Sequence, residues 1–168
     1  MKTVSLKTPY LLFVGDEARP SYAKTAVGVA DWRREACTAQ LRLTSDAYDL
    51  GLPDMSVAEA KAAGAKSLII GTALVGGSIP DSWIEVLAEA ARAGLDIVAG
   101  LHSRLADVPA LKEAAAQSGA SLIDIRVPPE DLPIANGKKR SGRRLLTVGT
   151  DCAWGKKYTS LQLEKDMK

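Results

Sequence analysis

The sequence has few of the residues that build metal centres and disulfide frameworks. It holds two cysteines, Cys37 and Cys152, and a single histidine, His102. Two distant cysteines make neither a disulfide framework nor a CxxC zinc site, and one histidine excludes a His-rich metal site. No apolar run approaches the roughly 20 residues of a membrane span. The apolar run at 10–14 is shorter than a signal-peptide core and is followed at once by acidic residues, so we expect a cytoplasmic protein.

The composition is that of a globular protein, with an uneven distribution of charge. The 168 residues are 46% apolar and 25% charged, which excludes disorder as the main state. Residues 1–135 hold 13 Lys/Arg and 17 Asp/Glu, a net charge of −4, whereas residues 136–168 hold 9 and 3, a net charge of +6. A local basic segment favours an anionic ligand or a partner surface. We expect a small acidic substrate and a homo-oligomer, and neither nucleic acid nor a membrane as a partner.

Short apolar runs alternate with helix-like segments along the first 130 residues. The predicted strands cover 10–14, 37–43, 67–71, 95–99 and 121–127. The predicted helices cover 22–32, a short segment opened by the Ser56–Glu59 capping box, 80–93, and 109–118 with Asp107 as its cap and Gly119 at its end. Strands separated by helices predict an α/β fold, a doubly wound Rossmann-like parallel sheet. An α+β arrangement is the alternative, because 33–55 is difficult to assign.

The last fifth of the chain is organised differently. We predict a Rossmann-like domain over 1–135, a basic linker over 136–144, and the start of a phosphate-loop domain over 145–168. The predicted start of this second domain is a strand at 145–148, a loop at 149–155 and a helix at 156–167. The linker holds five cations between Lys138 and Arg144. One strand and one helix bury no core of their own, so the second domain looks truncated. We therefore expect the 168-residue chain by itself to be catalytically inactive.

The segment 145–159, LLTVGTDCAWGKKYT, has the strand, Gly-bounded loop and Gly-Lys helix start of a phosphate loop, or Walker A motif. Five residues separate its two glycines where the common pattern has four, and Lys157 stands where a Mg²⁺-binding Ser or Thr is expected. The GTD opening resembles the loop of dethiobiotin synthetase-type ATPases. The alternative is a plain Gly-rich turn. The candidate cofactor-binding residues are Gly149, Thr150, Asp151, Gly155, Lys156, Lys157 and Thr159.

Three further segments follow predicted strands, and the carboxyl ends of parallel strands meet at one edge, where ligands bind. After 95–99, His102 is a candidate for proton transfer or a polar contact with the substrate, and Arg104 for binding a carboxylate or a phosphate. After 10–14, Asp16 is a second candidate base. After 67–71 come candidate substrate-binding residues, Gly76, Gly77 and Ser78. The alternatives are a surface histidine, an ion-paired arginine, and a turn in which Ser78 caps a helix.

Several segments together resemble one bacterial family, whose members include D-glutamate N-acetyltransferases. They are KTAVGVADWRREACTAQLRL, GTALVGGSIPDSW, AGLDIVAGLHSRLADVPAL and GKKRSGRRLLTVGTDCAWGKKYTSLQLEKDMK. The resemblance runs from about Tyr10 to Lys168, and Trp154 departs from the small or β-branched residue expected there. It implies a Rossmann-like domain followed by a phosphate-loop domain.

The resemblance also implies acetyl transfer from acetyl-CoA to the amine of D-glutamate, within D-amino-acid catabolism. Physical chemistry adds two hypotheses to this: a phosphate loop without its Mg²⁺ hydroxyl holds the phosphates of CoA, and His102 or Asp16 serves as the base. Two alternatives stay open. One is an ATP- and Mg²⁺-dependent ligase or kinase of the dethiobiotin synthetase type, and the other is a nucleotide- or CoA-binding module without catalysis.

Overall fold

The computed structural model describes residues 4–73, 77–127, 136–139, 141–149 and 155–168. The chain divides into two compact units, Met1–Pro129 and Glu130–Lys168. This division lies close to the predicted end of the Rossmann-like domain, while the basic linker over 136–144 stays a prediction.

The first unit is built on a parallel sheet of five strands in the order β2-β1-β3-β4-β5. The strands are β1 (Tyr10–Gly15), β2 (Cys37–Arg42), β3 (Ser67–Ile70), β4 (Asp96–Ala99) and β5 (Leu122–Asp124). The chain passes from β1 outward to β2 and then returns to the other side of β1 at β3. The carboxyl ends of β1 and β3 therefore form a topological switch point. The predicted doubly wound sheet is confirmed, and the α+β alternative is wrong.

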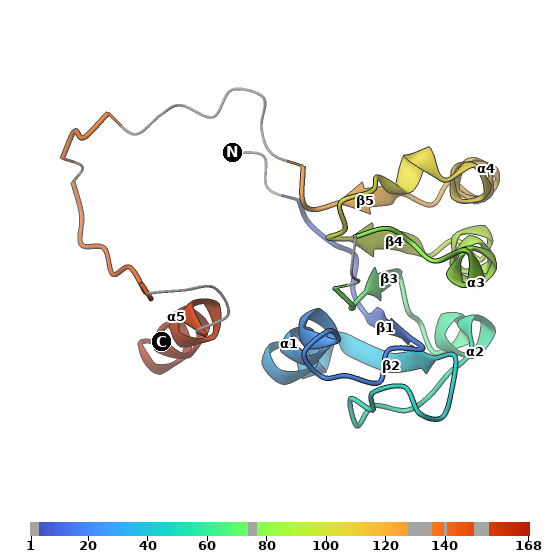
Figure 1. The fold of residues 1–168 in the computed structure, drawn as a ribbon, viewed down its shortest axis with the longest axis horizontal. Coiled ribbons are helices and arrows are strands. Elements are labelled where there is room, and N and C mark those ends of the chain that lie inside the picture. The colour runs from blue at the N-terminus through green and yellow to red at the C-terminus, as the bar shows by residue number, and fades with distance from the viewer. Residues whose placement is uncertain (1–3, 74–76, 128–135, 140, 150–154) are drawn as a thin grey trace. The chain divides into compact units, whose positions relative to one another are not determined.

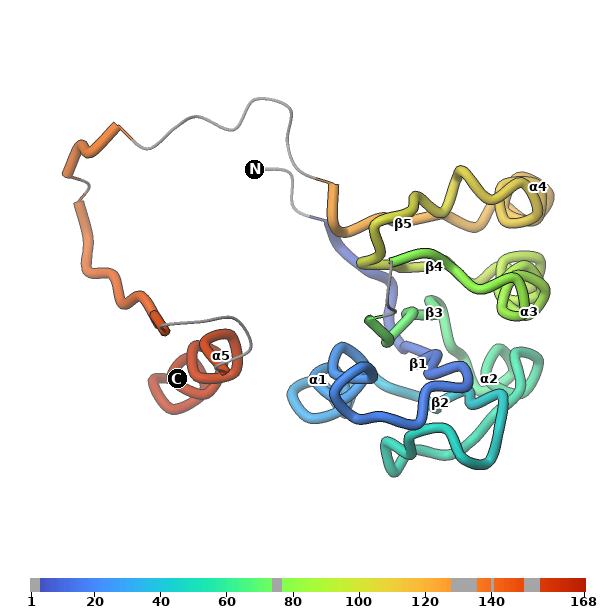
Figure 2. The backbone as a smooth tube through the Cα atoms, viewed as in Figure 1, coloured from blue at the N-terminus to red at the C-terminus, as the bar shows by residue number. Residues whose placement is uncertain are grey.

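Helices cover both faces of this sheet. Helix α1 (Lys24–Trp32) lies on one face, and α2 (Val57–Ala62), α3 (Asp81–Arg92) and α4 (Pro109–Ser118) lie together on the other (Figures 1 and 2). Right-handed crossovers require this division, because the direction of winding reverses after β2. Short 3₁₀ turns at Arg34–Ala36 and Leu105–Asp107 complete the connections.

The core under α3 is organised around one tryptophan. Trp83 is fully buried, and its ring meets the ring of Phe13 edge-on with centroids 4.9 Å apart. The Trp83 indole also fills the space beside Gly15 at the end of β1. A Cβ on Gly15 would lie 2.4 Å from Cζ2 of that indole, and Gly15 has a φ of +65°. Position 15 thus requires glycine for two reasons: the backbone has a positive φ, and the Trp83 indole leaves no space for a Cβ.

We predict that Gly15→Ala destabilises the first unit by about 3 kcal/mol, since left-handed strain adds to an overpacked contact. The matched control is Gly119→Ala, where φ is +77° and nothing lies within 4 Å of the added Cβ. The control is expected to lose only about 1 kcal/mol, the strain by itself. Urea unfolding followed by Trp fluorescence measures both. Equal losses would show that the contact with Trp83 relaxes without cost.

The helix ends agree with most of the sequence signals. The Ser56 capping box is present with both of its hydrogen bonds, and Gly119 is left-handed after α4. The predicted cap at Asp107 is wrong, and so is the alternative in which Ser78 caps a helix. Asp107 ends a 3₁₀ turn and Val108 is the N-cap of α4, while Pro80 is the N-cap of α3. Proline at the first position of α4 has the φ that a helix start requires, and α4 begins without a side-chain cap.

In the second unit, helix α5 spans Lys156–Asp166, as predicted to within a residue. The predicted strand at 145–148 is wrong, since these residues have no regular secondary structure. Leu145, Leu146 and Val148 are 69%, 80% and 76% exposed. A strand needs the hydrogen bonds of a neighbouring strand, and the described residues of this unit include none.

Candidate functional site

The loops after β4 and β5 enclose a small cavity at the carboxyl edge of the sheet. Its volume is about 190 Å³. Two of the predicted site residues, His102 and Arg104, line it from the loop after β4. The other side of the cavity is formed by Asp124, the last residue of β5, and by Arg126, two residues further on; no sequence pattern indicated either residue. The full lining is Leu101, His102, Ser103, Arg104, Asp124, Arg126 and Val127.

The cavity is rich in unneutralised positive charge. Among the residues that the structure describes, neither the Arg104 nor the Arg126 guanidinium forms an ion pair. Asp124 shares the cavity, but its two carboxylate oxygens accept the backbone N–H of Leu105, at 3.2 and 3.3 Å. Arginines exposed without a carboxylate partner beside a concave surface are suited to bind an anion.

His102 and Arg126 contact each other across the cavity. Nη1 of Arg126 lies 3.3 Å from Nε2 of His102. A guanidinium only donates hydrogen bonds, so a hydrogen bond between these two atoms makes Nε2 the acceptor and requires the tautomer with its proton on Nδ1. In this arrangement the Nε2 lone pair of His102 is already engaged.

Gly77, from the loop after β3, holds His102 in place. The Gly77 carbonyl accepts the backbone N–H of His102 at 3.1 Å and that of Ser103 at 3.3 Å. A Cβ on Gly77 would lie 2.2 Å from Cδ2 of the His102 ring, and Gly77 has a φ of +69°. The predicted proximity of Gly77 and His102 is confirmed, while their roles stay predictions.

We predict that Gly77→Ala displaces the His102 ring; if His102 has the catalytic role for which it is a candidate, kcat/KM falls about tenfold, since misplacing a catalytic group is costly. The His102 side chain is exposed and outside the hydrophobic core, so displacing it by a Cβ on Gly77 is expected to leave the fold intact. Gly64→Ala is the matched control, because Gly64 also has a positive φ, +95°, with nothing within 4 Å. Steady-state kinetics and thermal unfolding of both variants test this. Equal kinetics for the two variants would contradict it.

Asp16 lies elsewhere on the same edge. Its Oδ1 accepts the indole N–H of Trp83 at 3.0 Å, which ties the end of β1 to α3. Asp16 is exposed, but it does not line the cavity, and neither does Ser78. Gly76 lies outside the described residues. Of the five residues predicted for this edge that the structure describes, it brings together His102, Arg104 and Gly77.

The switch point between β1 and β3 is occupied by the chain itself. The N–H of Ala26, in α1, donates to the Gly71 carbonyl at 2.8 Å, and a Cβ on Gly71 would lie 2.3 Å from the Ala26 methyl. Small residues at both positions let the first turn of α1 pack directly against the end of β3. This contact explains why the cavity lies one strand further along, at β4 and β5.

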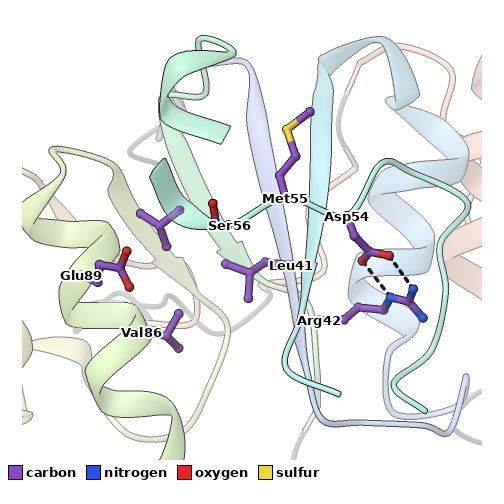
Figure 3. Close-up of a pocket in the computed structure, with 8 residues that line it drawn as sticks. Leu41, Arg42, Asp54, Met55, Ser56, Val86 and Glu89 are labelled. Atoms are coloured by element: carbon purple, nitrogen blue, oxygen red, sulfur yellow. Dashed lines mark hydrogen bonds and ion pairs between the residues drawn. The ribbon is translucent and has the colours of Figure 1, made fainter. Parts of the chain in front are cut away.

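A larger cavity, of about 370 Å³, lies beside β2 (Figure 3). Arg42 and Asp54 point toward each other on one side of the strand, while Leu41, Val86 and Glu89 lie on the other. Arg42 Nε donates to Asp54 at 2.8 Å and Nη1 donates to the Ala47 carbonyl at 3.0 Å. The hydrogen bond from Arg42 holds the pKa of the Asp54 carboxyl below its usual range. These charges neutralise each other, so this cavity is the weaker candidate. Its other lining residues are Met55, Ser56 and Val57.

The predicted phosphate loop is described only at its ends. Gly155 has a φ of +75° and is the N-cap of α5, and the Thr159 hydroxyl donates to the Gly155 carbonyl at 3.1 Å. Lys157 is exposed on the first turn of α5. Thr150 and Asp151 lie outside the described residues, so a phosphate cradle formed by them with Gly149 and Lys156 stays a prediction.

Within the described part of the chain, no group of three or more His, Cys, Asp or Glu side chains is placed to hold a metal ion. None of the described helices has both the length and the apolar character to cross a membrane.

Two family models match the chain. Residues 33–128 match a Rossmann-like domain described as a domain of unknown function, DUF1611_N. Residues 133–168 match a P-loop domain, DUF1611_C, also of unknown function.

Similar proteins cover nearly the whole chain. It is 47% identical over 163 residues to a D-glutamate N-acetyltransferase of Tritonibacter scottomollicae, covering 97% of this chain and 49% of the relative. It is 42% identical over 165 residues to a protein of the same name from Pseudoalteromonas sp, covering 98% and 50%. The crystal structure of a DUF1611 family protein from Anabaena variabilis superposes with a TM-score of 0.78 at 29% identity, covering 95% and 49%. The chain thus spans about half the length of the relatives it matches.

Proposed function

Because this chain belongs to the family defined by the DUF1611 Rossmann-like and P-loop domains, we propose that the protein transfers an acetyl group to the amine of D-glutamate. This is the activity named for the two relatives that match it over nearly its whole length.

The charge pattern of the cavity at β4 and β5 is the observation that carries the proposal. The cavity presents two guanidinium groups, of Arg104 and Arg126, and one carboxylate, of Asp124. Glutamate presents the complement, two carboxylates and one ammonium. The volume of about 190 Å³ is below the roughly 300–1,000 Å³ of pockets for drug-sized ligands, and suits a molecule of amino-acid size.

The acetyl donor in this proposal is acetyl-CoA, which needs a second binding region for its phosphates. Residues 136–168 carry a net charge of +6, and Lys156 opens α5, where a helix N-terminus favours an anion. Lys157 stands in the place of a Mg²⁺-binding hydroxyl, which favours binding of CoA over hydrolysis of a nucleotide.

His102 is the proposed general base. In the reactive state Nε2 takes a proton from the substrate ammonium, and the resulting amine attacks the acetyl carbonyl carbon. The carbon–sulfur bond then breaks, and the proton that the nitrogen still loses goes to the departing thiolate. His102 returns its own proton to solvent, which balances the reaction. Asp16 is the alternative base.

The direct test is an acetyl-transfer assay on the longest natural protein that contains this chain. Thiol release from acetyl-CoA is followed with D-glutamate, L-glutamate or D-glutamine as the acceptor, and mass spectrometry identifies the product. We expect N-acetyl-D-glutamate and the fastest turnover with D-glutamate. Mg²⁺-dependent ATP hydrolysis without acetyl transfer would contradict the proposal and favour a ligase or kinase.

A further inference from the structure

The contact between Arg126 and His102 involves Nε2, the same nitrogen that acts as the base in the proposed function. As long as Arg126 donates to Nε2, that nitrogen has no lone pair available for a substrate proton. We propose that Arg126 binds a carboxylate of the acceptor, and that this carboxylate draws Arg126 away from His102 and frees the base. This inference rests on the proposed function.

The relative strengths of the two interactions favour the exchange. The contact of 3.3 Å is longer than the usual N–H hydrogen bond of about 2.9–3.0 Å, and its acceptor is neutral. A carboxylate offers the guanidinium two parallel hydrogen bonds and a full opposite charge, which together are stronger. An acceptor carboxylate that enters the cavity therefore competes successfully with the imidazole for Arg126.

The surroundings of the pair determine which partner moves. The main chain of His102 is bonded to Gly77, whose Cα lies against the imidazole ring. Arg126 is exposed, and the described residues give it no other hydrogen-bond partner. The charged groups that share the cavity with His102 are Arg104, Arg126 and Asp124. His102 thus stays in place, while Arg126 is free to turn toward a ligand.

Because Arg126 must leave His102 before the base can act, the choice of acceptor is expected to affect kcat as well as KM. An acceptor with two carboxylates engages Arg104 and Arg126 together and releases Nε2. An acceptor with a neutral side chain, such as D-glutamine, binds Arg104 through its single carboxylate and leaves Arg126 on His102. D-Glutamine is therefore expected to have both a higher KM and a lower kcat than D-glutamate.

The kinetic test compares Arg126→Gln with the wild type on D-glutamate and D-glutamine. We expect the KM for D-glutamate to rise about 10- to 100-fold, the loss of affinity that follows from losing one charge-assisted hydrogen bond. We expect the kcat for D-glutamine to rise, because His102 is released without a second carboxylate. Arg126→Lys keeps the charge but not the planar fork, and is expected to fall between the two. Arg92→Gln, an exposed arginine of α3 paired with Glu85, is the control for loss of charge.

A second readout does not depend on turnover. His102 is the one histidine of the 168-residue chain, so ¹⁵N NMR of the imidazole in this chain, which needs no turnover, reports on His102 without ambiguity. Adding glutarate, a dicarboxylate without an amine, is expected to move the Nε2 resonance toward that of an imidazole nitrogen free of hydrogen bonds. Arg126→Gln is expected to show this position before glutarate is added, and Arg92→Gln is expected to respond like the wild type.

The two proposals fail in different ways. If no acceptor is acetylated but glutarate shifts the Nε2 resonance only when Arg126 is present, the proposed function is wrong and the carboxylate site stands. If D-glutamate is acetylated and Arg126→Gln keeps the wild-type KM and the preference over D-glutamine, the inference about Arg126 is wrong. An Nε2 resonance that glutarate leaves unchanged in the wild type would also overturn it.

Discussion

Replacing His102 by glutamine is expected to lower kcat for acetylation of D-glutamate by about 10²- to 10⁴-fold, the contribution of a positioned general base. Glutamine keeps a polar side chain but cannot take the proton of the substrate ammonium. KM is expected to change little, because the proposed carboxylate contacts belong to Arg104 and Arg126. His102 is exposed, so the variant is expected to fold normally. Steady-state kinetics with acetyl-CoA and D-glutamate measure the effect.

Asp16→Asn is the matched variant, because Asp16 is the other candidate base. The asparagine side-chain oxygen still accepts the Trp83 indole N–H, so the tie between β1 and α3 is kept. Asp16 does not line the cavity, so this variant is expected to retain most of its kcat. A collapse of kcat in Asp16→Asn with near-normal turnover in His102→Gln would transfer the role of base to Asp16.

Arg104→Ala is expected to raise the KM for D-glutamate by about 10- to 100-fold, with a smaller effect on kcat. A guanidinium that binds a carboxylate contributes equally to the ground state and the transition state, so its loss appears mainly in KM. The structure leaves Arg104 without an ion pair among the described residues, which is consistent with a role in binding a ligand.

Two comparisons test this interpretation of Arg104. Arg92→Ala removes an exposed arginine from α3 and is expected to leave KM unchanged. Arg104→Ala combined with Arg126→Gln is expected to abolish measurable saturation by D-glutamate, because both carboxylates lose their partners. An unchanged KM in Arg104→Ala would show that this arginine is structural and that the cavity binds the acceptor by other groups.

Local sequence patterns predicted the Rossmann-like unit well. The apolar runs gave all five strands to within a few residues, and the capping box at Ser56 and the left-handed Gly119 are where the sequence placed them. These features depend on residues close together in the chain, so they can be inferred from spacing. The family resemblance is also confirmed, by relatives 47% and 42% identical along nearly the whole chain.

The end of β5 shows where such patterns stop being sufficient. The sequence predicted a strand through Val127, which would have placed Arg126 inside the sheet. The strand ends at Asp124, level with Ala99, the last residue of β4. An edge strand pairs only as far as its neighbour extends, and that length is not encoded in its own residues. Arg126 therefore belongs to the loop, opposite His102.

The sequence by itself determined the parallel sheet, its helices and the polar loops that follow β1, β3 and β4. Only the tertiary structure decided which of these loops form a site. The first turn of α1 packs into the switch point because Gly71 and Ala26 are small, and Trp83 holds Asp16 at a distance from the cavity lining. His102 and Arg104 instead meet Arg126 and Asp124 across neighbouring strands. Contacts of this kind depend on packing between distant segments, which no local pattern contains.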